Sequence, residues 1–191
     1  ECDILIMKVL KNAAFGKVAV IHTPSPSRRE PDCPYYGKCG GCDFRHMDYT
    51  EELSAKRQRV QDALSRIGGS AVQVEEILGG LDTACYRNKS QYPISPNGMV
   101  GFYRARSHEV VPVERCLIQR PEADAAAQAV RQYIRRFRVP CYDEKTGKGL
   151  LRHLYVRTNG AGESLICLLG CGDRAPHEPE LTALLREAVP K

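Results

Sequence analysis

The sequence of 191 residues has no tryptophan, and its net charge of +5 is too small to indicate a partner by itself. No apolar run approaches the roughly 18 residues that a membrane-spanning helix needs, so we expect no membrane span. The first residues, Glu1-Cys2-Asp3, lack both an initiator methionine and the basic start of a signal peptide. We therefore expect a piece of a longer cytoplasmic protein. With 42% hydrophobic residues, the chain can still bury a core.

Cysteine, in contrast, is abundant: there are nine, an odd number, and no secretion signal accompanies them. Exported disulfide-rich domains are usually short and have an even count, so these cysteines indicate a reducing compartment and a metal or cluster site. Three of them stand in one short run as Cys33, Cys39 and Cys42. Glycines at positions 40 and 41 let that backbone curl tightly enough to bring the sulfurs together. Cys116 is the candidate for a fourth ligand.

Four thiolates suit two kinds of centre, and their spacing leaves both possible. Structural zinc sites usually combine two short cysteine pairs, whereas this sequence has a single pair, Cys39 and Cys42. Iron–sulfur clusters accept wider and less symmetric spacing. The spacing favours an iron–sulfur cluster over zinc, and a site without metal is the third possibility.

Acidic residues are missing from positions 86–107, where four basic residues stand: Arg87, Lys89, Arg104 and Arg106. A phosphate backbone selects such a local asymmetry, so this stretch is a candidate RNA-binding surface. The alternative is an ordinary solvated strand face. Tyr92, Phe102 or Tyr103 would be available to stack on bases, with core packing as the alternative for them.

The hydrophobic pattern predicts an α+β fold, in which a mixed or antiparallel sheet of short strands carries packed helices. Strands are expected at 3–10, 17–21, 72–78, 86–94, 99–105, 110–117, 150–158 and 163–169. Helices are expected from Asp48 to Gly68, at 121–138 and at 179–188. The expected segments are the last strands of a small β-barrel (1–23), a linker with the cysteine loop (24–47) and a further domain (48–191).

Four details of this pattern are specific enough to check. The first two strands should form a mostly buried hairpin. Asp48 and Glu51 should form a capping box at the start of the first helix. The strands at 86–94 and 99–105 should pair across Asn97-Gly98, and Cys116 should lie on the strand at 110–117. In the second helix, three arginines should face the solvent: Arg131, Arg135 and Arg136.

Several runs of the sequence carry a resemblance to a known family. They are Pro24-Ser25-Pro26-Ser27-Arg28, Pro31-Asp32-Cys33-Pro34-Tyr35, Cys39-Gly40-Gly41-Cys42 followed by His46, Tyr49, Leu53 and Lys56, then Tyr86-Arg87-Asn88-Lys89, Gly101-Phe102-Tyr103 and Leu151-Arg152-His153-Leu154. Together they resemble the bacterial RNA 5-methyluridine methyltransferases, and more narrowly the iron–sulfur-containing 23S ribosomal RNA uracil-5 methyltransferases. The likeness extends from about residue 24 to near the end. Arg45 and Glu52 depart from it, because the family has glutamines there.

The resemblance implies a four-iron, four-sulfide cluster held by Cys33, Cys39, Cys42 and Cys116. It implies that residues 1–23 end an oligonucleotide-binding barrel and that residues 48–191 form a central RNA-binding domain. It implies ribosomal RNA as the partner, and it adds Arg152 and His153 to the candidate RNA contacts, with a packed pair as the alternative. The sequence gives no sign of a membrane or of an obligate protein partner. A zinc-stabilised nucleic-acid-binding module and a transfer-RNA uracil-5 methyltransferase are the alternatives to this assignment.

In such an enzyme a cysteine thiolate attacks C6 of an unstacked uracil, C5 takes the methyl group of S-adenosylmethionine, and a carboxylate removes the C5 proton. This sequence shows neither the glycine-rich turn that binds S-adenosylmethionine nor the nucleophile's sequence context. We therefore assign no catalytic residue and no residue that binds S-adenosylmethionine. The 191 residues alone are expected to be inactive.

Overall fold

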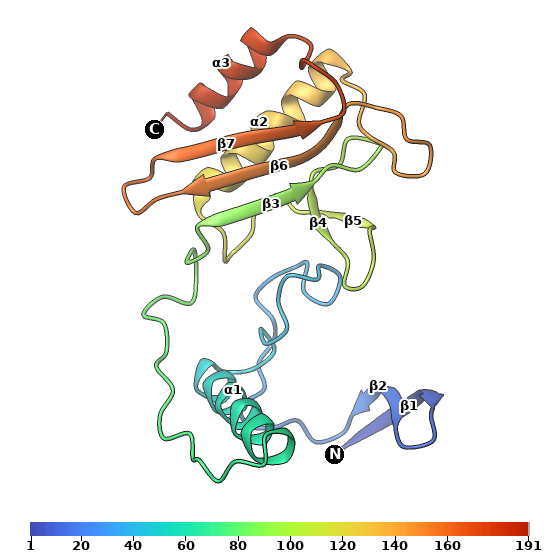
Figure 1. Ribbon diagram of the computed structural model, residues 1–191, viewed down its shortest axis with the longest axis vertical. Coiled ribbons are helices and arrows are strands. Elements are labelled where there is room, and N and C mark those ends of the chain that lie inside the picture. The colour runs from blue at the N-terminus through green and yellow to red at the C-terminus, as the bar shows by residue number, and fades with distance from the viewer. Residues whose placement is uncertain (191) are drawn as a thin grey trace. The chain divides into compact units, whose positions relative to one another are not determined.

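The computed structural model describes residues 1–190 (Figure 1). Contacts between residues divide the chain into two compact units. Unit 1 consists of Glu1–Asp32 and Phe44–Ile77, and unit 2 consists of Cys33–Asp43 and the chain from Leu78 onward. The cysteine loop therefore groups with the C-terminal part of the chain. The domain boundaries proposed from the sequence, after residues 23 and 47, stay predictions.

Unit 1 begins with an antiparallel hairpin of β1 (Cys2–Val9) and β2 (Ala14–Ile21), as predicted. Its expected burial is wrong, because every residue of both strands is exposed. Ile6, for example, is 54% exposed and Phe15 is 55% exposed. The hairpin carries apolar side chains on both faces, and within residues 1–190 no second layer covers either of them.

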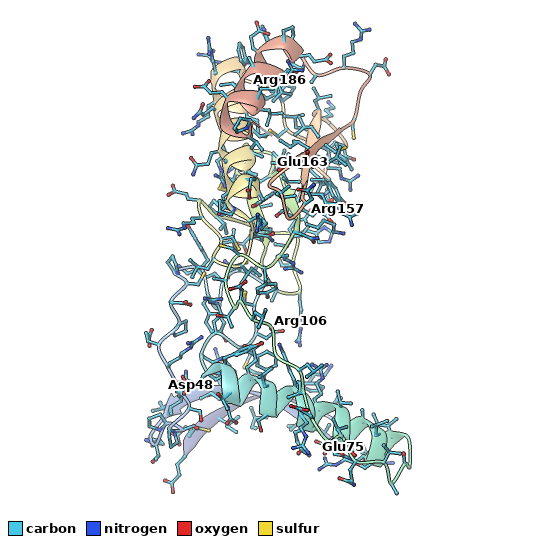
Figure 2. The ribbon with its side chains drawn as sticks, turned by 90° about the vertical axis from the view of Figure 1, so that its left-hand side faces the viewer. Asp48, Glu75, Arg106, Arg157, Glu163 and Arg186 are labelled. Atoms are coloured by element: carbon cyan, nitrogen blue, oxygen red, sulfur yellow. The ribbon has the colours of Figure 1, made fainter. Side chains whose placement is uncertain are left out.

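The first helix is α1 (Tyr49–Asp62), which continues as the π-helical turn η1 (Ala63–Ile67). It starts after Asp48 and ends at Gly68, as predicted, and Gly69 follows with a φ of +60°. The predicted capping box is wrong, because the side chain of Asp48 makes no capping hydrogen bond. The Glu51 carboxylate instead accepts a hydrogen bond from the Ser27 hydroxyl at 3.5 Å. Figure 2 labels Asp48 at this end of α1.

The strand predicted at 72–78 is also wrong: this segment forms no β-ladder. It is held to the helix by side chains instead. Arg57 Nε donates to the Val74 carbonyl at 2.8 Å, and Gln61 Nε2 donates to the Val72 carbonyl at 3.1 Å. The Val74 amide in turn donates to Gln61 Oε1 at 2.8 Å. The Gln61 amide group thus satisfies backbone groups that a neighbouring strand would otherwise satisfy.

Unit 2 contains a three-stranded antiparallel sheet in the order β3 (Lys89–Pro93), β6 (Leu151–Thr158), β7 (Ser164–Gly170). A separate ribbon pairs β4 (Gly101–Tyr103) with β5 (Val110–Pro112). Two helices follow the expected ranges, α2 (Pro121–Phe137) and α3 (Glu178–Ala188). One face of the sheet packs on α2 (Figure 1). Tyr92 and Leu154 from the sheet and Val130 from the helix are fully buried in this core. These elements confirm the predicted α+β class.

The predicted pairing of 86–94 with 99–105 is largely wrong. The turn forms: the Gly98 amide donates to the Ser95 carbonyl at 2.8 Å, and Gly98 has a φ of +79°. A single bridge, between Ile94 and Val100, then joins the two segments. Beyond this bridge β3 pairs with β6, and β4 pairs with β5. Gly101 shows why β4 pairs with β5, since a Cβ on it would come within 1.9 Å of the carbonyl oxygen of Val111.

Two further expectations in unit 2 need correction. The strand β5 ends at Pro112, which has no N–H to extend the ladder, so Cys116 lies in the loop between β5 and α2 and not on a strand. Arg131 does not face the solvent but donates to the carbonyls of Val100 and Val113, which fixes α2 to the chain around β4 and β5. Arg135 and Arg136 are exposed, as predicted.

Candidate cysteine site and basic surface

The four cysteines singled out in the sequence line one small cavity of unit 2. All four are partly buried. The rest of the lining is mostly apolar or aromatic and comes from Tyr35, Tyr36, Gly41, Arg87, Phe102, Val113, Ile118 and Gln119. The fold therefore brings Cys116 to the loop that carries the other three cysteines, as the sequence predicted.

The loop from Cys33 to Cys42 curls through backbone hydrogen bonds of its own. The Tyr36 amide donates to the Cys33 carbonyl at 3.1 Å, and the Cys39 amide donates to the Tyr35 carbonyl at 2.9 Å. The Tyr36 hydroxyl donates to the Asp43 carbonyl at 2.7 Å and closes the end of the loop. These bonds turn the three sulfur-bearing residues toward one centre.

The same loop is paired with the end of β4. The Gly40 amide donates to the Tyr103 carbonyl at 2.9 Å, and Cys39 forms an antiparallel bridge with Arg104. A Cβ on Gly40 would lie 2.9 Å from the Ala105 amide nitrogen, so the two backbones can approach this closely only at a glycine. The cysteine loop thus pairs with the end of β4 through its backbone, over two residues.

The Cys116 loop is held from two sides. The Cys116 amide donates to Asp124 Oδ2 at 2.9 Å, and the Tyr92 hydroxyl donates to Asp124 Oδ1 at 3.0 Å. On the other side the Arg87 amide donates to the Ile118 carbonyl at 2.9 Å. The helix α2 and the segment before β3 therefore fix the position of Cys116. Asp124 was missed in the sequence, because an acidic residue in the first turn of a helix is common for its interaction with the helix dipole alone.

Partial burial shifts the pKa of two thiols in the cysteine site, those of Cys39 and Cys116. It raises the pKa of the Cys39 thiol, and the nearby Cys33 raises it further. Burial likewise raises the pKa of Cys116, with smaller contributions from Asp124 and Cys39. The neutral thiol is therefore favoured at both positions. A bound metal cation reverses that preference, because it stabilises the thiolate.

Whether these cysteines can hold a metal centre depends on whether that centre is a single ion or a cluster. Within residues 1–190, no group of three or more His, Cys, Asp or Glu side chains is placed to hold one metal ion. A single zinc ion needs its thiolates around one point. In a four-iron cluster each thiolate binds its own iron, so the sulfurs surround a volume. The four cysteines line one cavity, and no three of them meet around one point.

The six candidate RNA contacts all lie in unit 2 but do not form one patch. Arg87 lines the cysteine cavity, and Lys89 starts β3 opposite Arg157 of β6. Arg106 is exposed in the turn after β4, with a φ of +57° (Figure 2). Arg104 is engaged in a bidentate ion pair with Glu109, with distances of 2.7 and 2.8 Å.

Arg152 and His153 belong to a second polar cluster at the start of β6. Glu144 accepts a hydrogen bond from Arg152 at 3.1 Å and contacts His108 Nδ1 at 2.8 Å. The Tyr103 hydroxyl lies 3.4 Å from His153 Nε2. Burial lowers the pKa of His153, so this imidazole is neutral at pH 7. Arg104 and Arg152 are thus balanced by carboxylates, while Lys89 and Arg106 contribute the less compensated charge.

Comparison with known proteins identifies proteins that are similar to this chain in sequence. No family model matches the chain. An uncharacterized RNA methyltransferase of Clostridium tetani is 45% identical over 191 residues, which are 98% of this chain and 42% of that protein. One of Bacillus cereus is 39% identical over 196 residues, which are 100% of this chain and 42% of that protein. The chain is similar to RNA methyltransferases. It spans about two fifths of the length of these relatives.

A solved structure shows the same fold. The crystal structure of Pyrococcus abyssi tRNA (uracil-54, C5)-methyltransferase, in complex with S-adenosyl-L-homocysteine, matches 95% of this chain and 41% of that chain. The TM-score is 0.69 and the sequences are 20% identical. The expected similarity to RNA methyltransferases is confirmed by the sequence relatives, and the solved structure adds the fold. None of the helices in the described residues has the length and apolar character needed to cross a bilayer.

Proposed function

We propose that this chain is the iron–sulfur and RNA-binding region of an S-adenosylmethionine-dependent 23S ribosomal RNA uracil-5 methyltransferase that acts in the cytoplasm. The relatives support RNA methylation, and the solved neighbour, with S-adenosyl-L-homocysteine bound, supports the methyl donor. The cysteine run supports the ribosomal RNA type. In this proposal residues 1–23 belong to a small barrel, 24–47 to the linker and cysteine loop, and 48–191 to the central domain.

One observation carries the proposal: the cysteine cavity is built from the same backbone segments that carry the basic residues. The cysteine loop pairs with Tyr103 at the end of β4 and with Arg104, two residues before Arg106. The Cys116 loop pairs with the segment containing Arg87, two residues before β3 begins at Lys89. Any group that ties the four sulfurs together would therefore also fix both basic segments.

Cys33, Cys39, Cys42 and Cys116 would hold the cluster as thiolates. When bound, it supplies a covalent cross-link between loops far apart in the sequence and no electrons for the reaction, because methyl transfer changes no oxidation state of the protein. Arg87, Lys89, Arg104 and Arg106 would contact phosphates, and Arg152 and His153 would contact RNA beside them. The chemistry at uracil would belong to residues outside this chain.

Metal analysis of protein purified without oxygen tests the proposal. We expect about four irons and four sulfides per chain, with a broad brown absorbance that is lost in Cys39→Ser. Cys171→Ser is the matched control, because Cys171 is exposed and does not line the cavity, and it should keep the full iron content. One zinc and no iron would replace the proposal with a zinc-stabilised nucleic-acid-binding module. Equal iron loss in both variants would contradict the assignment of the ligands.

A further inference from the structure

The three-stranded sheet of unit 2 has one face that neither α2 nor α3 covers in the described residues. Burial alternates along β3, where Ser90 and Tyr92 are buried and Lys89 and Gln91 are exposed. The register places Lys89 opposite Arg157, and it places Tyr155 between Gln91 on β3 and Cys167 on β7. Because successive side chains of a strand point to opposite faces, these exposed residues share the face away from α2. We call this surface the open face.

The open face has a one-sided charge. The sequences of β3, β6 and β7 contain no aspartate or glutamate, and Lys89 and Arg157 lie on this face. Arg152 instead has the parity of the buried Leu154 and is paired with Glu144. The cross-strand pair of Lys89 and Arg157 places two like charges side by side, which destabilises a sheet unless an anion lies over them. Such a pair would suit a polyanion.

Tyr155 gives the open face an aromatic centre. It is partly exposed, and it stands two residues from Arg157 on the same face, a separation of about 7 Å along the strand. Its cross-strand neighbours, Gln91 and Cys167, are both exposed, so they leave the face of the sheet around the ring accessible. An aromatic ring beside cations on an open sheet is the arrangement that stacks a base and holds the adjoining phosphates.

Beyond Arg157 the surface continues as a shallow concavity lined by Asn88, Asn159, Glu163 and Ser164. Figure 2 shows Arg157 and Glu163 near each other at this end of the sheet. The Glu163 carboxylate accepts a hydrogen bond from Asn159 at 2.6 Å, which ties it to the turn between β6 and β7. The Asn159 amide and the Ser164 hydroxyl also make hydrogen bonds within this turn, which leaves the Asn88 side chain to bond to a sugar or a base edge.

We propose that the open face binds single-stranded RNA, with Tyr155 stacking on one base and the Lys89–Arg157 pair contacting the phosphates beside it. The proposal rests on the RNA-binding role proposed above and names a surface and two residues, Tyr155 and Arg157, for it. A duplex keeps its bases stacked on one another, so it offers no free base to Tyr155 and should bind more weakly.

Fluorescence anisotropy with a labelled single-stranded RNA of mixed sequence, and the same RNA as a duplex, tests this on the whole chain. Tyr155→Leu should weaken single-strand binding about 5- to 150-fold, the loss expected for one stacked base. Tyr155→Phe keeps the ring and should bind like the unmodified protein. Arg157→Ala should reduce the dependence of log Kd on log salt by about 0.7, the value for one phosphate contact on a single strand.

Arg186→Ala is the matched control, because Arg186 is an exposed arginine of α3 and does not lie on the sheet (Figure 2). It should leave both affinity and salt dependence nearly unchanged. If the unmodified protein binds the single strand and Tyr155→Leu binds it equally well, the open face is not the platform, while the proposed function stands. If Tyr155→Phe is as weak as Tyr155→Leu, base stacking is refuted. If the unmodified protein binds neither RNA, the RNA-binding role itself fails.

Discussion

Replacement of Gly40 by alanine should separate the cysteine loop from β4. The Gly40 amide donates to the Tyr103 carbonyl at 2.9 Å, so the two backbones lie in direct contact. The added methyl group would come 2.9 Å from the amide nitrogen and 3.0 Å from the Cα of Ala105, and 3.0 Å from the Tyr103 oxygen. All three are backbone atoms, which cannot rotate away as a flexible side chain can.

The magnitude follows from the cost of overpacking. Inserting a methyl group into a close contact typically costs about 1–3 kcal/mol, and we expect Gly40→Ala to fall in that range. For a chain of this size, that corresponds to a decrease in Tm of roughly 2–12 °C. Gly41→Ala is the matched control one residue away, because its Cβ would meet only the Cys39 sulfur at an ordinary 3.4 Å. It should lower Tm by less than about 2 °C.

Thermal unfolding monitored by circular dichroism measures both variants, and iron analysis on the same samples reports the cysteine site. Gly40→Ala should lower the iron content together with Tm, since Cys39 is bridged to Arg104 through the displaced backbone. A Tm for Gly40→Ala equal to that of the unmodified protein would refute the pairing of the loop with β4. A loss in Gly41→Ala as large as in Gly40→Ala would show that any added methyl group in this loop is harmful.

Three further outcomes are expected. Asp124→Ala should cost about 1–3 kcal/mol in a denaturant titration, because it removes the acceptor of the Cys116 amide, whereas Asp124→Asn keeps an oxygen there and should cost less than half as much. The pKa of His153 is lowered by burial from its usual 6.5, so its contribution to stability is complete above pH 6.5 and is lost as the pH falls through the lower folded value. An NMR titration midpoint at or above 6.5 would contradict this. Gln61→Ala should speed hydrogen exchange at the Val74 amide without changing the exchange of the core of unit 2.

Local patterns predicted the helices and the turns well. The apolar spacing of α2 gave its inner face, with Val130 and Ile134 buried, and Pro121 marked its start. The turn at Gly98 was predicted because its backbone needs a positive φ, which glycine adopts without strain. Each of these features depends on residues close together in the chain, so a short window of sequence contains the whole cause.

Strand partners and polar anchors could not be predicted in the same way. The sequence places β3 next to β4, but β3 pairs with β6, because Tyr92 and Leu154 are buried together against α2. These two residues are about sixty positions apart, so no short window of the sequence indicates that their strands pair. Asp124 was missed for a similar reason, since its two donors come from β3 and from the Cys116 loop. The gathering of the four cysteines was predicted because a metal or cluster site needs several thiolates at one place.

The placement of the cysteine site relative to the core explains why a cross-link would be useful there. The core of unit 2 joins α2, α3 and the three-stranded sheet, and no residue of the segment Cys33–Asp43 is buried. The contacts that hold this segment include the Gly40 amide on the Tyr103 carbonyl and the Glu114 amide on the Tyr35 hydroxyl at 3.2 Å. Such hydrogen bonds contribute only about 1 kcal/mol each. Binding of one group by all four sulfurs would add the stability that burial does not supply, and the basic segments paired with these loops would become ordered with them.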